Sequence, residues 1–245
     1  WKIAVSYDSR IKSSIFARVA SEVFAANGIQ VHVYNEIMPT PCLSFAVRSL
    51  QCAAGIMITA SHNPSQYNGY KVYGDDGCQI TAMAAKEILQ KINGLDIFKD
   101  ITRMDYDSAV KDELIQYISD EVITDFISAV KDQSVLLSTD HINRDVSIIY
   151  SPLNGTGLKP VLRILNESGY TNIIVVKEQE QPDGHFPTCP YPNPEIKEAM
   201  QLGIQYAYKY NADILLATDP DCDRVGIAVK DEKGEPIIVK KGFRK

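Results

Sequence analysis

Short apolar runs alternate with amphipathic segments along the first part of the chain. The runs at residues 3–6, 29–34 and 55–59 have the length and composition of buried strands. After the first run, apolar residues recur at helical spacing, and Ser13 or Ser14 is placed to cap the helix. We expect its apolar face to consist of Ile15, Phe16, Val19, Ala20, Val23 and Phe24. A second helix precedes the third run, and this order predicts a parallel sheet with right-handed crossovers.

Weaker patterns continue the same unit beyond the third run. Residues 69–73 predict a further strand. Thr81 is placed to cap a helix that reaches about Asn93, and residues 121–131 predict another helix. Residues 95–118 are polar and show no clear period, so we assign no element there.

A second α/β pattern occupies the rest of the chain. Apolar runs at residues 146–150, 173–176 and 214–217 predict strands, and helical spacing follows Gly157 and Asn193. The pattern therefore repeats the strand-helix alternation of the first half.

The chain ends in a predicted hairpin formed by residues 225–229 and 236–239. We therefore expect an α/β fold class, with two tandem α/β domains that have mixed, mainly parallel sheets. The first domain is expected at residues 1–132 and the second at 133–240, with 241–245 opening a linker to a further domain.

Composition narrows the class of protein. Of the 245 residues, 45% are hydrophobic and 23% charged, which is typical of a soluble globular protein. No apolar run approaches the roughly 18 residues of a membrane span. A net charge of −6 without a Lys/Arg block argues against nucleic-acid or membrane-surface binding. The five cysteines are scattered and form no Cys-x-x-Cys pair, so we expect reduced thiols in a cytoplasmic protein. Nothing in the sequence indicates an oligomeric state.

Three acidic residues follow the run at residues 214–217. Asp219, Asp221 and Asp223 alternate along a tight loop, so their carboxylates can converge on one hard cation such as Mg²⁺. Spacing alone favours the alternative of a solvated acidic turn. The position after a buried strand, with Arg224 adjacent, favours a metal site. An EF-hand is disfavoured because the loop lacks the glutamate at position twelve.

Ser61 follows the third apolar run in a polar turn, at the end of the strand where α/β sheets carry their chemistry. Our hypothesis is that Ser61 carries a phosphoryl group, although an ordinary turn serine is the alternative. A hydrolase nucleophile is disfavoured because the Gly-x-Ser-x-Gly elbow is absent. His62 is adjacent, and adjacent side chains seldom reach one reacting atom, so a Ser-His pair is weakly indicated. A phosphoserine needs cations, which Mg²⁺, Arg10 and Arg224 would supply.

Two further basic residues lie near predicted strand ends. Lys71 is on the strand after the serine turn, and a partly desolvated lysine beside other cations loses its proton easily enough to act as a general base. A surface lysine is the alternative. Arg10 follows the first strand, where it would form either a phosphate clamp or a surface salt bridge, and its position favours the clamp.

Several stretches together strongly resemble the α-D-phosphohexomutase superfamily. They are Thr59-Ala60-Ser61-His62-Asn63-Pro64, Asn68-Gly69-Tyr70-Lys71 and Asp219-Pro220-Asp221-Cys222-Asp223-Arg224, with Tyr7-Asp8-Ser9-Arg10 in support. Within the superfamily, residues 67–73 and Tyr191-Pro192-Asn193-Pro194-Glu195 are most similar to the phosphoglucomutase/phosphopentomutase branch. The resemblance extends from the first strand to the end of the chain.

The resemblance implies a role for each matching residue. Ser61 corresponds to the serine that is phosphorylated and that, as a phosphoserine, is a metal ligand. The other implied Mg²⁺ ligands are Asp219, Asp221 and Asp223. Arg224 and Arg10 correspond to residues that contact the phosphoryl group, Lys71 to the general base, and His62 to a residue that assists proton transfer.

The reaction implied by the resemblance is an isomerisation of a small phosphosugar. A phosphoryl group moves between the 1- and 6-positions of a hexose, most readily glucose, through a hexose 1,6-bisphosphate, and glucose 1,6-bisphosphate would be the activator or intermediate. Mutases of phosphomannose, phosphoglucosamine or phosphopentose are alternatives, and a non-catalytic phosphosugar-binding protein is an alternative of another class.

The superfamily also has four domains, of which this chain matches the first two and the opening of the third. The chain begins on a strand-forming run without a start methionine, so we expect no signal peptide and a piece of a longer gene product. We expect such a piece to fold and hold metal, but to turn over poorly or not at all by itself.

Overall fold

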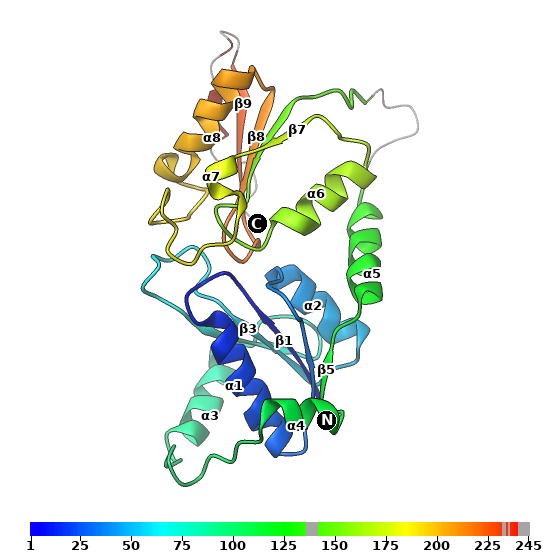
Figure 1. The fold of residues 1–245 in the computed structure, drawn as a ribbon, viewed down its shortest axis with the longest axis vertical. Coiled ribbons are helices and arrows are strands. Elements are labelled where there is room, and N and C mark those ends of the chain that lie inside the picture. Colours follow the sequence, from blue (N-terminus) through cyan, green and yellow to red (C-terminus); the bar gives the residue numbers. More distant parts are fainter. Residues whose placement is uncertain (136–141, 232–233, 235, 240–245) are drawn as a thin grey trace. The chain divides into compact units, whose positions relative to one another are not determined.

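The computed structural model describes residues 1–135, 142–231, 234 and 236–239, and the chain forms two compact units (Figure 1). Unit 1 comprises Trp1–Asp8, Lys12–Ala60 and Asn68–Ile123. Unit 2 comprises Ser9–Ile11, Ser61–Tyr67 and Thr124–Lys245. The expected domain boundary after residue 132 stays a prediction, and the expected linker at 241–245 lies outside the described residues.

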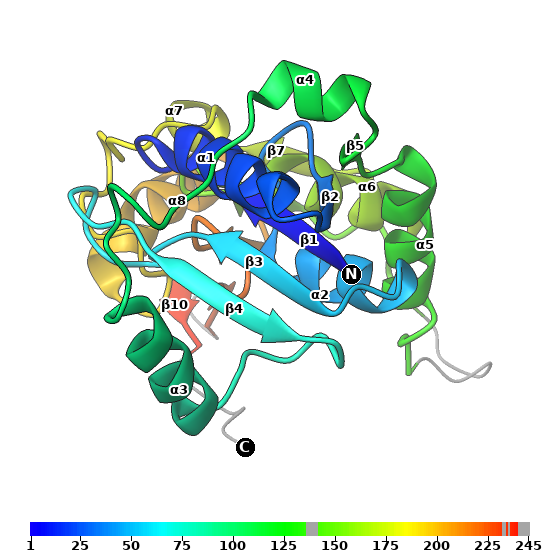
Figure 2. The same ribbon diagram turned by 90° about the horizontal axis from the view of Figure 1, so that it is seen from below.

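Unit 1 is built on a five-stranded sheet in the order β4-β3-β1-β2-β5. Its strands are β1 (Lys2–Tyr7), β2 (Gln30–Val33), β3 (Ala54–Ile58), β4 (Tyr70–Gly74) and β5 (Ile115–Tyr117). Neighbouring strands pair in parallel except for β4, which is antiparallel to β3. Figure 2 shows β3 and β4 side by side. The edge strand β5 and the short helix α4 (Tyr106–Lys111) lie in the stretch to which the sequence pattern assigned no element.

Helices pack on both faces of this sheet because its side chains alternate between the faces. On one face, Val5 and Ile56 contact α1 (Ser13–Ala26). On the other face, Ala4 and Met57 contact α2 (Thr40–Ser49). The remaining helices are α3 (Ala82–Ile92), which Thr81 caps as expected, and α5 (Asp120–Lys131).

The predicted apolar face of α1 is not the face that the helix buries most deeply, although Phe24 does pack against the core. The helix buries Ser13, Ala17, Ser21 and Ala25 together with Glu22. Ile15 is 55% exposed and Phe16 45%, and the predicted apolar side instead lines an open groove with Tyr70 and Ile101. Small side chains allow the helix to approach the sheet closely, and apolar periodicity alone does not reveal that choice.

The predicted cap of α1 was wrong. Lys12 is the N-terminal cap residue, with a positive φ of 65°, and no side chain caps the helix. The hydroxyl of Ser13 instead donates a hydrogen bond to Asp8 Oδ1 at 2.8 Å. The start of α1 is therefore tied to the end of β1.

Unit 2 contains a second five-stranded sheet, in the order β10-β9-β8-β6-β7. Its strands are β6 (Ile148–Ser151), β7 (Ile173–Val175), β8 (Ile214–Thr218), β9 (Val225–Lys230) and β10 (Pro236–Ile238). β6, β7 and β8 are parallel, whereas β9 and β10 form antiparallel pairs. The predicted fold class, two α/β domains with mixed, mainly parallel sheets, is confirmed.

The helices of unit 2 are α6 (Leu158–Glu167), α7 (Lys177–Glu180) and α8 (Lys197–Tyr210). Met200 and Ala207 of α8 pack against Ile149 and Leu215 of the sheet. Helix α8 begins later than predicted, because the backbone after Asn193 first forms a turn in which Asn193 Oδ1 accepts from Glu195 N. Among the described helices, none combines the length and apolar character needed to span a bilayer.

The two candidate loops occupy equivalent places in the two sheets. β3 lies between parallel β1 and antiparallel β4, and β8 lies between parallel β6 and antiparallel β9. Residues 59–69 connect β3 to β4, and residues 219–224 connect β8 to β9. Both loops therefore lie where a sheet changes from parallel to antiparallel pairing.

The five cysteines are reduced thiols in different surroundings. Cys42, Cys52 and Cys189 are buried, and Cys78 is exposed. Burial raises the pKa of Cys52 and of Cys189 to about 11. Cys222 is intermediate in exposure, and burial of its thiol raises its pKa to about 12.

Candidate active site

Unit 2 contains the aspartate loop together with two short segments from the first part of the chain. These segments are Ser9–Ile11, which follows β1, and Ser61–Tyr67, which follows β3. Most of the predicted site residues therefore belong to unit 2, and each of these lies in a loop: Arg10, Ser61, His62, Asp219, Asp221, Asp223 and Arg224.

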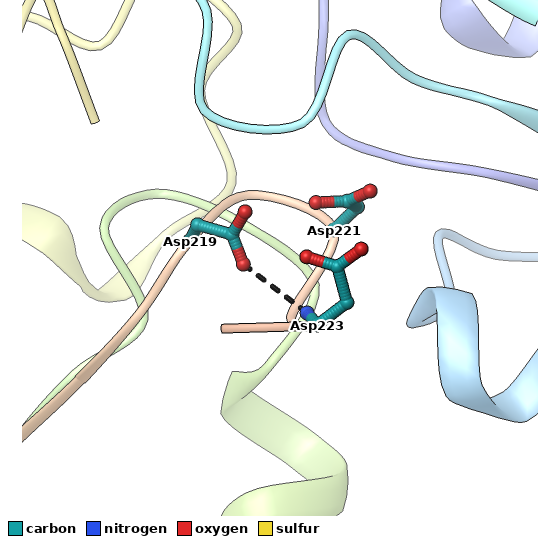
Figure 3. Close-up of side chains that lie close together, drawn as sticks. All are labelled: Asp219, Asp221 and Asp223. Atoms are coloured by element: carbon teal, nitrogen blue, oxygen red, sulfur yellow. Dashed lines mark hydrogen bonds between the residues drawn. The ribbon is translucent and has the colours of Figure 1, made fainter. Parts of the chain in front are cut away.

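The three aspartates converge as the sequence predicted (Figure 3). One carboxylate oxygen from each residue lies within 4.8 Å of the other two. Asp219 and Asp221 are fully buried, whereas Asp223 is exposed. Asp219 Oδ1 accepts hydrogen bonds from the backbone N–H groups of Asp223 at 3.1 Å and Arg224 at 3.0 Å. The loop thus folds back on its first carboxylate.

The charge of this cluster calls for a cation. Burial raises the pKa of Asp219 to about 8, and the nearby Asp221 and Asp223 carboxylates add to the rise. Two fully buried carboxylates and a third close by repel one another unless a positive charge offsets them. The donor set consists of oxygen atoms alone, which is what Mg²⁺ prefers. The residues present therefore fit a divalent metal ion.

Ser61 lies directly against the aspartate loop. Its hydroxyl donates a hydrogen bond to Asp219 Oδ2 at 2.9 Å, across a separation of 158 residues in sequence. The residue is 8% exposed and has a positive φ of 52°, a backbone conformation that is uncommon for residues other than glycine. The imidazole Nδ1 of His62 lies 3.2 Å from the same hydroxyl. The hydroxyl therefore faces both a carboxylate and an imidazole.

Arg10 holds the serine turn by its main chain. Its guanidinium donates to four backbone carbonyl oxygens, those of Ser61 (2.6 Å), Asn63, Pro64 (3.0 Å) and Tyr67 (2.9 Å). It also stacks on Phe186, with 5.1 Å from its central carbon to the ring centroid. In this arrangement Arg10 organises the turn, and its predicted contact with a phosphoryl group stays a prediction.

His62 and Arg224 are contacted by a turn to which the sequence assigned no role in the site. Tyr191 lies edge-on to the His62 ring, with 6.1 Å between centroids. Glu195 accepts from the Arg224 guanidinium at 3.3 Å. Burial lowers the pKa of His62, and Arg224 lowers it further. The motif containing Tyr191 and Glu195 was visible in the sequence, but only the fold shows what these residues contact.

Lys71 is the one predicted site residue in unit 1. It lies on β4, opposite Met57 of β3 in the antiparallel register. Its role as a general base stays a prediction.

Comparison with known proteins identifies what this arrangement is similar to. A family model described as phosphoglucomutase/phosphomannomutase, alpha/beta/alpha domain I, matches residues 1–97, and the model of domain II matches residues 123–234. Together these matches take in both candidate loops.

Individual relatives agree with the family models. The chain is 41% identical over 224 residues to a phosphoglucomutase of Staphylococcus saprophyticus, covering 91% of this chain and 40% of the relative. It is 35% identical to a phosphoribomutase of Saccharomyces cerevisiae, covering 94% of this chain and 39% of the relative. The crystal structure of a putative phosphomannomutase from Thermus thermophilus superposes with a TM-score of 0.76 at 25% identity, covering 96% of this chain and 49% of that one. The chain thus spans less than half the length of each of these three relatives.

Proposed function

The chain belongs to the phosphoglucomutase/phosphomannomutase family, and on that premise we propose that it carries the phosphoserine and the metal site of a phosphosugar mutase. The reaction is a reversible isomerisation in which a phosphoryl group moves between the 1- and 6-positions of a hexose. Ser61 is the residue that donates and receives that group.

One observation carries this proposal. The Ser61 hydroxyl lies 2.9 Å from the buried carboxylate of Asp219, whose loop presents three converging carboxylates. A phosphoryl group on Ser61 would bring nearly two negative charges and three oxygens beside these carboxylates. Such an arrangement is stable only with a cation between them, which is the arrangement a metal-assisted phosphoryl donor needs.

In the proposed forward step, a sugar hydroxyl attacks the phosphorus of phosphorylated Ser61. A new oxygen–phosphorus bond forms, the bond to Ser61 Oγ breaks, and Lys71 takes the proton of the attacking hydroxyl. Mg²⁺, when bound by the three aspartates and the phosphoserine, supplies positive charge that stabilises the departing oxygen. His62, 3.2 Å from Ser61 Oγ, assists proton transfer at that oxygen.

The arginines position the group that moves. Arg224 contacts the phosphoryl oxygens, and Arg10 keeps the serine turn in place through four carbonyl oxygens while it contributes positive charge to the same group. After transfer, the sugar 1,6-bisphosphate reorients in the site. Its other phosphate then returns to Ser61 by the reverse of the same step. The enzyme therefore ends each cycle phosphorylated.

Glucose phosphate is the proposed substrate, with glucose 1,6-bisphosphate as intermediate and activator. The support is the 41% identity to a phosphoglucomutase, while relatives named for ribose and mannose phosphates keep those sugars as alternatives. The small-molecule phosphosugar is the proposed partner, and the cytoplasm is the proposed location. We place the first domain at residues 1–132 and the second at 133–240.

Mass spectrometry of the intact 245-residue chain and of its proteolytic peptides tests the proposal. After incubation with Mg²⁺ and glucose 1,6-bisphosphate, we expect a gain of about 80 Da, the mass of one phosphoryl group, on a peptide containing Ser61. The gain should vanish in Ser61→Ala and persist in Ser65→Ala, a matched control in the same turn. Phosphate on Ser61→Ala, or none on wild type and on a longer product of the same gene, would overturn it.

A further inference from the structure

The loop between β6 and α6 takes no part in the proposed reaction, yet it packs against the aspartate loop. It consists of residues 152–157 and follows β6, which is the parallel neighbour of β8. Its contacts converge on Pro220, the residue between the two buried aspartates Asp219 and Asp221. These contacts point to a function for the loop in the geometry of the metal site.

Thr156 makes the central contact. Its backbone N–H donates to the carbonyl oxygen of Pro220 at 2.9 Å, and its side-chain hydroxyl donates to the same oxygen at 3.0 Å. Thr156 is 4% exposed, so these hydrogen bonds are shielded from water. Two donors from one residue fix both the position and the direction of that carbonyl group.

The glycines on either side of Thr156 leave the two loops no room to move closer or to slide. A Cβ atom on Gly155 would lie 2.5 Å from Pro220 Cα and 2.6 Å from its oxygen. A Cβ atom on Gly157 would lie 2.6 Å from Thr218 Oγ1 and 3.0 Å from Cys222 Sγ. This loop is therefore in contact with residues on both sides of Pro220, Thr218 at the end of β8 and Cys222 in the aspartate loop.

The other side of the loop is fixed as firmly. Asn154 donates through its backbone N–H to Gln179 O at 2.9 Å and through its side chain to Gln181 O at 2.8 Å. Its own carbonyl accepts from Asp183 N at 3.0 Å. Leu153 and Asn154 both have positive φ, of 45° and 57°, so the turn is tight. A turn held in this way can impose its geometry on the loop that it contacts.

We propose that Thr156 is a positioning residue of the metal site. By holding the Pro220 carbonyl through two hydrogen bonds, it keeps the carboxylates of Asp219 and Asp221 convergent before a cation binds, so that less ordering is needed on binding. The inference rests on the proposed function, since it requires that the aspartates bind Mg²⁺.

Substitution of Thr156 by its isostere separates this role from a packing role. Thr156→Val keeps the shape and the backbone donor but removes the hydroxyl, whereas Thr156→Ser keeps the hydroxyl and removes the methyl group. Isothermal titration of the metal-free 245-residue chain with Mg²⁺ should show roughly tenfold weaker binding in Thr156→Val, as for other outer-shell contacts of metal ligands. Thr156→Ser should bind within about twofold of wild type, since it keeps both donors.

The results separate the positioning role of Thr156 from the proposal that the aspartates bind Mg²⁺. Equal Mg²⁺ affinity in Thr156→Val and wild type, with only a lower melting temperature, would overturn the positioning role and leave the metal site intact. Equal weakening in Thr156→Ser and Thr156→Val would also overturn it, because packing of the methyl group would then be the cause. If Thr156→Val does not fold, Thr156→Ala replaces it with the same expectation. Absence of Mg²⁺ binding in folded wild type would refute the metal site, and this inference with it.

Discussion

The serine turn at residues 59–69 and the aspartate loop at residues 219–224 are topologically equivalent but are held in place differently. Each connects a strand to its antiparallel neighbour, and each has one non-glycine residue at a positive φ, 52° at Ser61 and 53° at Cys222. The serine turn depends on the side chain of Arg10, which donates to four of its carbonyl oxygens.

The aspartate loop is held mainly by hydrogen bonds of its own backbone and of a neighbouring loop. Cys222 N donates to Asp219 O at 2.9 Å, Asp219 Oδ1 accepts from two further N–H groups, and Thr156 donates twice to Pro220 O. The serine turn also has backbone hydrogen bonds of its own, from Thr59 N to Gly69 O and from Tyr67 N to Pro64 O, but one distant side chain supplies four further hydrogen bonds to it. In the aspartate loop, by contrast, the donors come from several residues.

The largest expected effect comes from removing the guanidinium of Arg10. Arg10→Met leaves four carbonyl oxygens of the serine turn without this donor in a site where Arg10 is only 3% exposed. We expect a loss of about 4 kcal/mol in the free energy of unfolding, because buried groups that lose a hydrogen-bond partner retain their desolvation cost. Denaturant titration followed by circular dichroism measures this loss.

The arginine of the aspartate loop is the matched control for Arg10. Arg224 is 37% exposed and pairs through its side chain with Glu195, which is 51% exposed. Arg224→Met should cost less than about 1 kcal/mol, as for other exposed ion pairs. If Arg10→Met and Arg224→Met lower the free energy of unfolding equally, then the serine turn does not depend on its arginine more than the aspartate loop does.

The next effect is the pH dependence of the free energy of unfolding, which we expect to arise from the aspartate loop. The pKa of Asp219 is raised to about 8 in the folded protein, so the folded state keeps a proton that the unfolded state releases near pH 4. The metal-free protein should therefore lose stability as pH rises between about 4 and 8. Above that range both states are deprotonated and the loss levels off.

Metal should abolish this dependence. Mg²⁺ binds the deprotonated carboxylates, so in saturating Mg²⁺ the folded state no longer keeps the extra proton, and the free energy of unfolding should be nearly level over the same pH range. Denaturant titrations at several pH values, with and without Mg²⁺, measure both slopes. Asp219→Asn is the control, because it has no proton to release at this position. A slope unchanged in Asp219→Asn would assign the pH dependence to other groups.

The smallest effect tests a feature that the two loops share. A Cβ atom on Gly69 would lie 2.5 Å from Thr59 O in the serine turn, just as one on Gly155 would lie 2.5 Å from Pro220 Cα. Gly69→Ala and Gly155→Ala should each cost about 2 kcal/mol of unfolding free energy, because backbone must move to admit the methyl group. Gly94→Ala, whose nearest contact would be 3.4 Å, should change stability by less than about 0.5 kcal/mol. Thermal unfolding of the three variants would contradict this if Gly94→Ala were as unstable as the others.

Local patterns predicted the order of the elements better than their packing. Apolar runs predicted the central strands because buried strands of parallel sheets are apolar on both faces. They missed β5, which has three residues at a sheet edge and lies in a polar stretch. Apolar spacing did not reveal the buried face of α1, because the small residues Ala17 and Ala25 lie deepest against the sheet and Phe24 is only partly buried there.

In the candidate site, too, local features were predictable from the sequence and long-range contacts were not. Asp219, Asp221 and Asp223 were predictable because local spacing brings their carboxylates together. The contacts of Arg10 were not, because they join segments more than 50 residues apart through main-chain carbonyls, which have no sequence signature. For the same reason nothing in the sequence indicated that Thr156 would meet Pro220.

The uneven surroundings of the five thiols have a practical use. Maleimide dyes react with the thiolate, and burial keeps Cys52, Cys189 and Cys222 protonated at neutral pH, so the exposed Cys78 should be labelled first. Cys78 lies in unit 1. A donor fluorophore there, with an acceptor on a cysteine introduced at Tyr210 of α8, would turn the distance between the two units into an energy-transfer signal that can be followed while a phosphosugar is added.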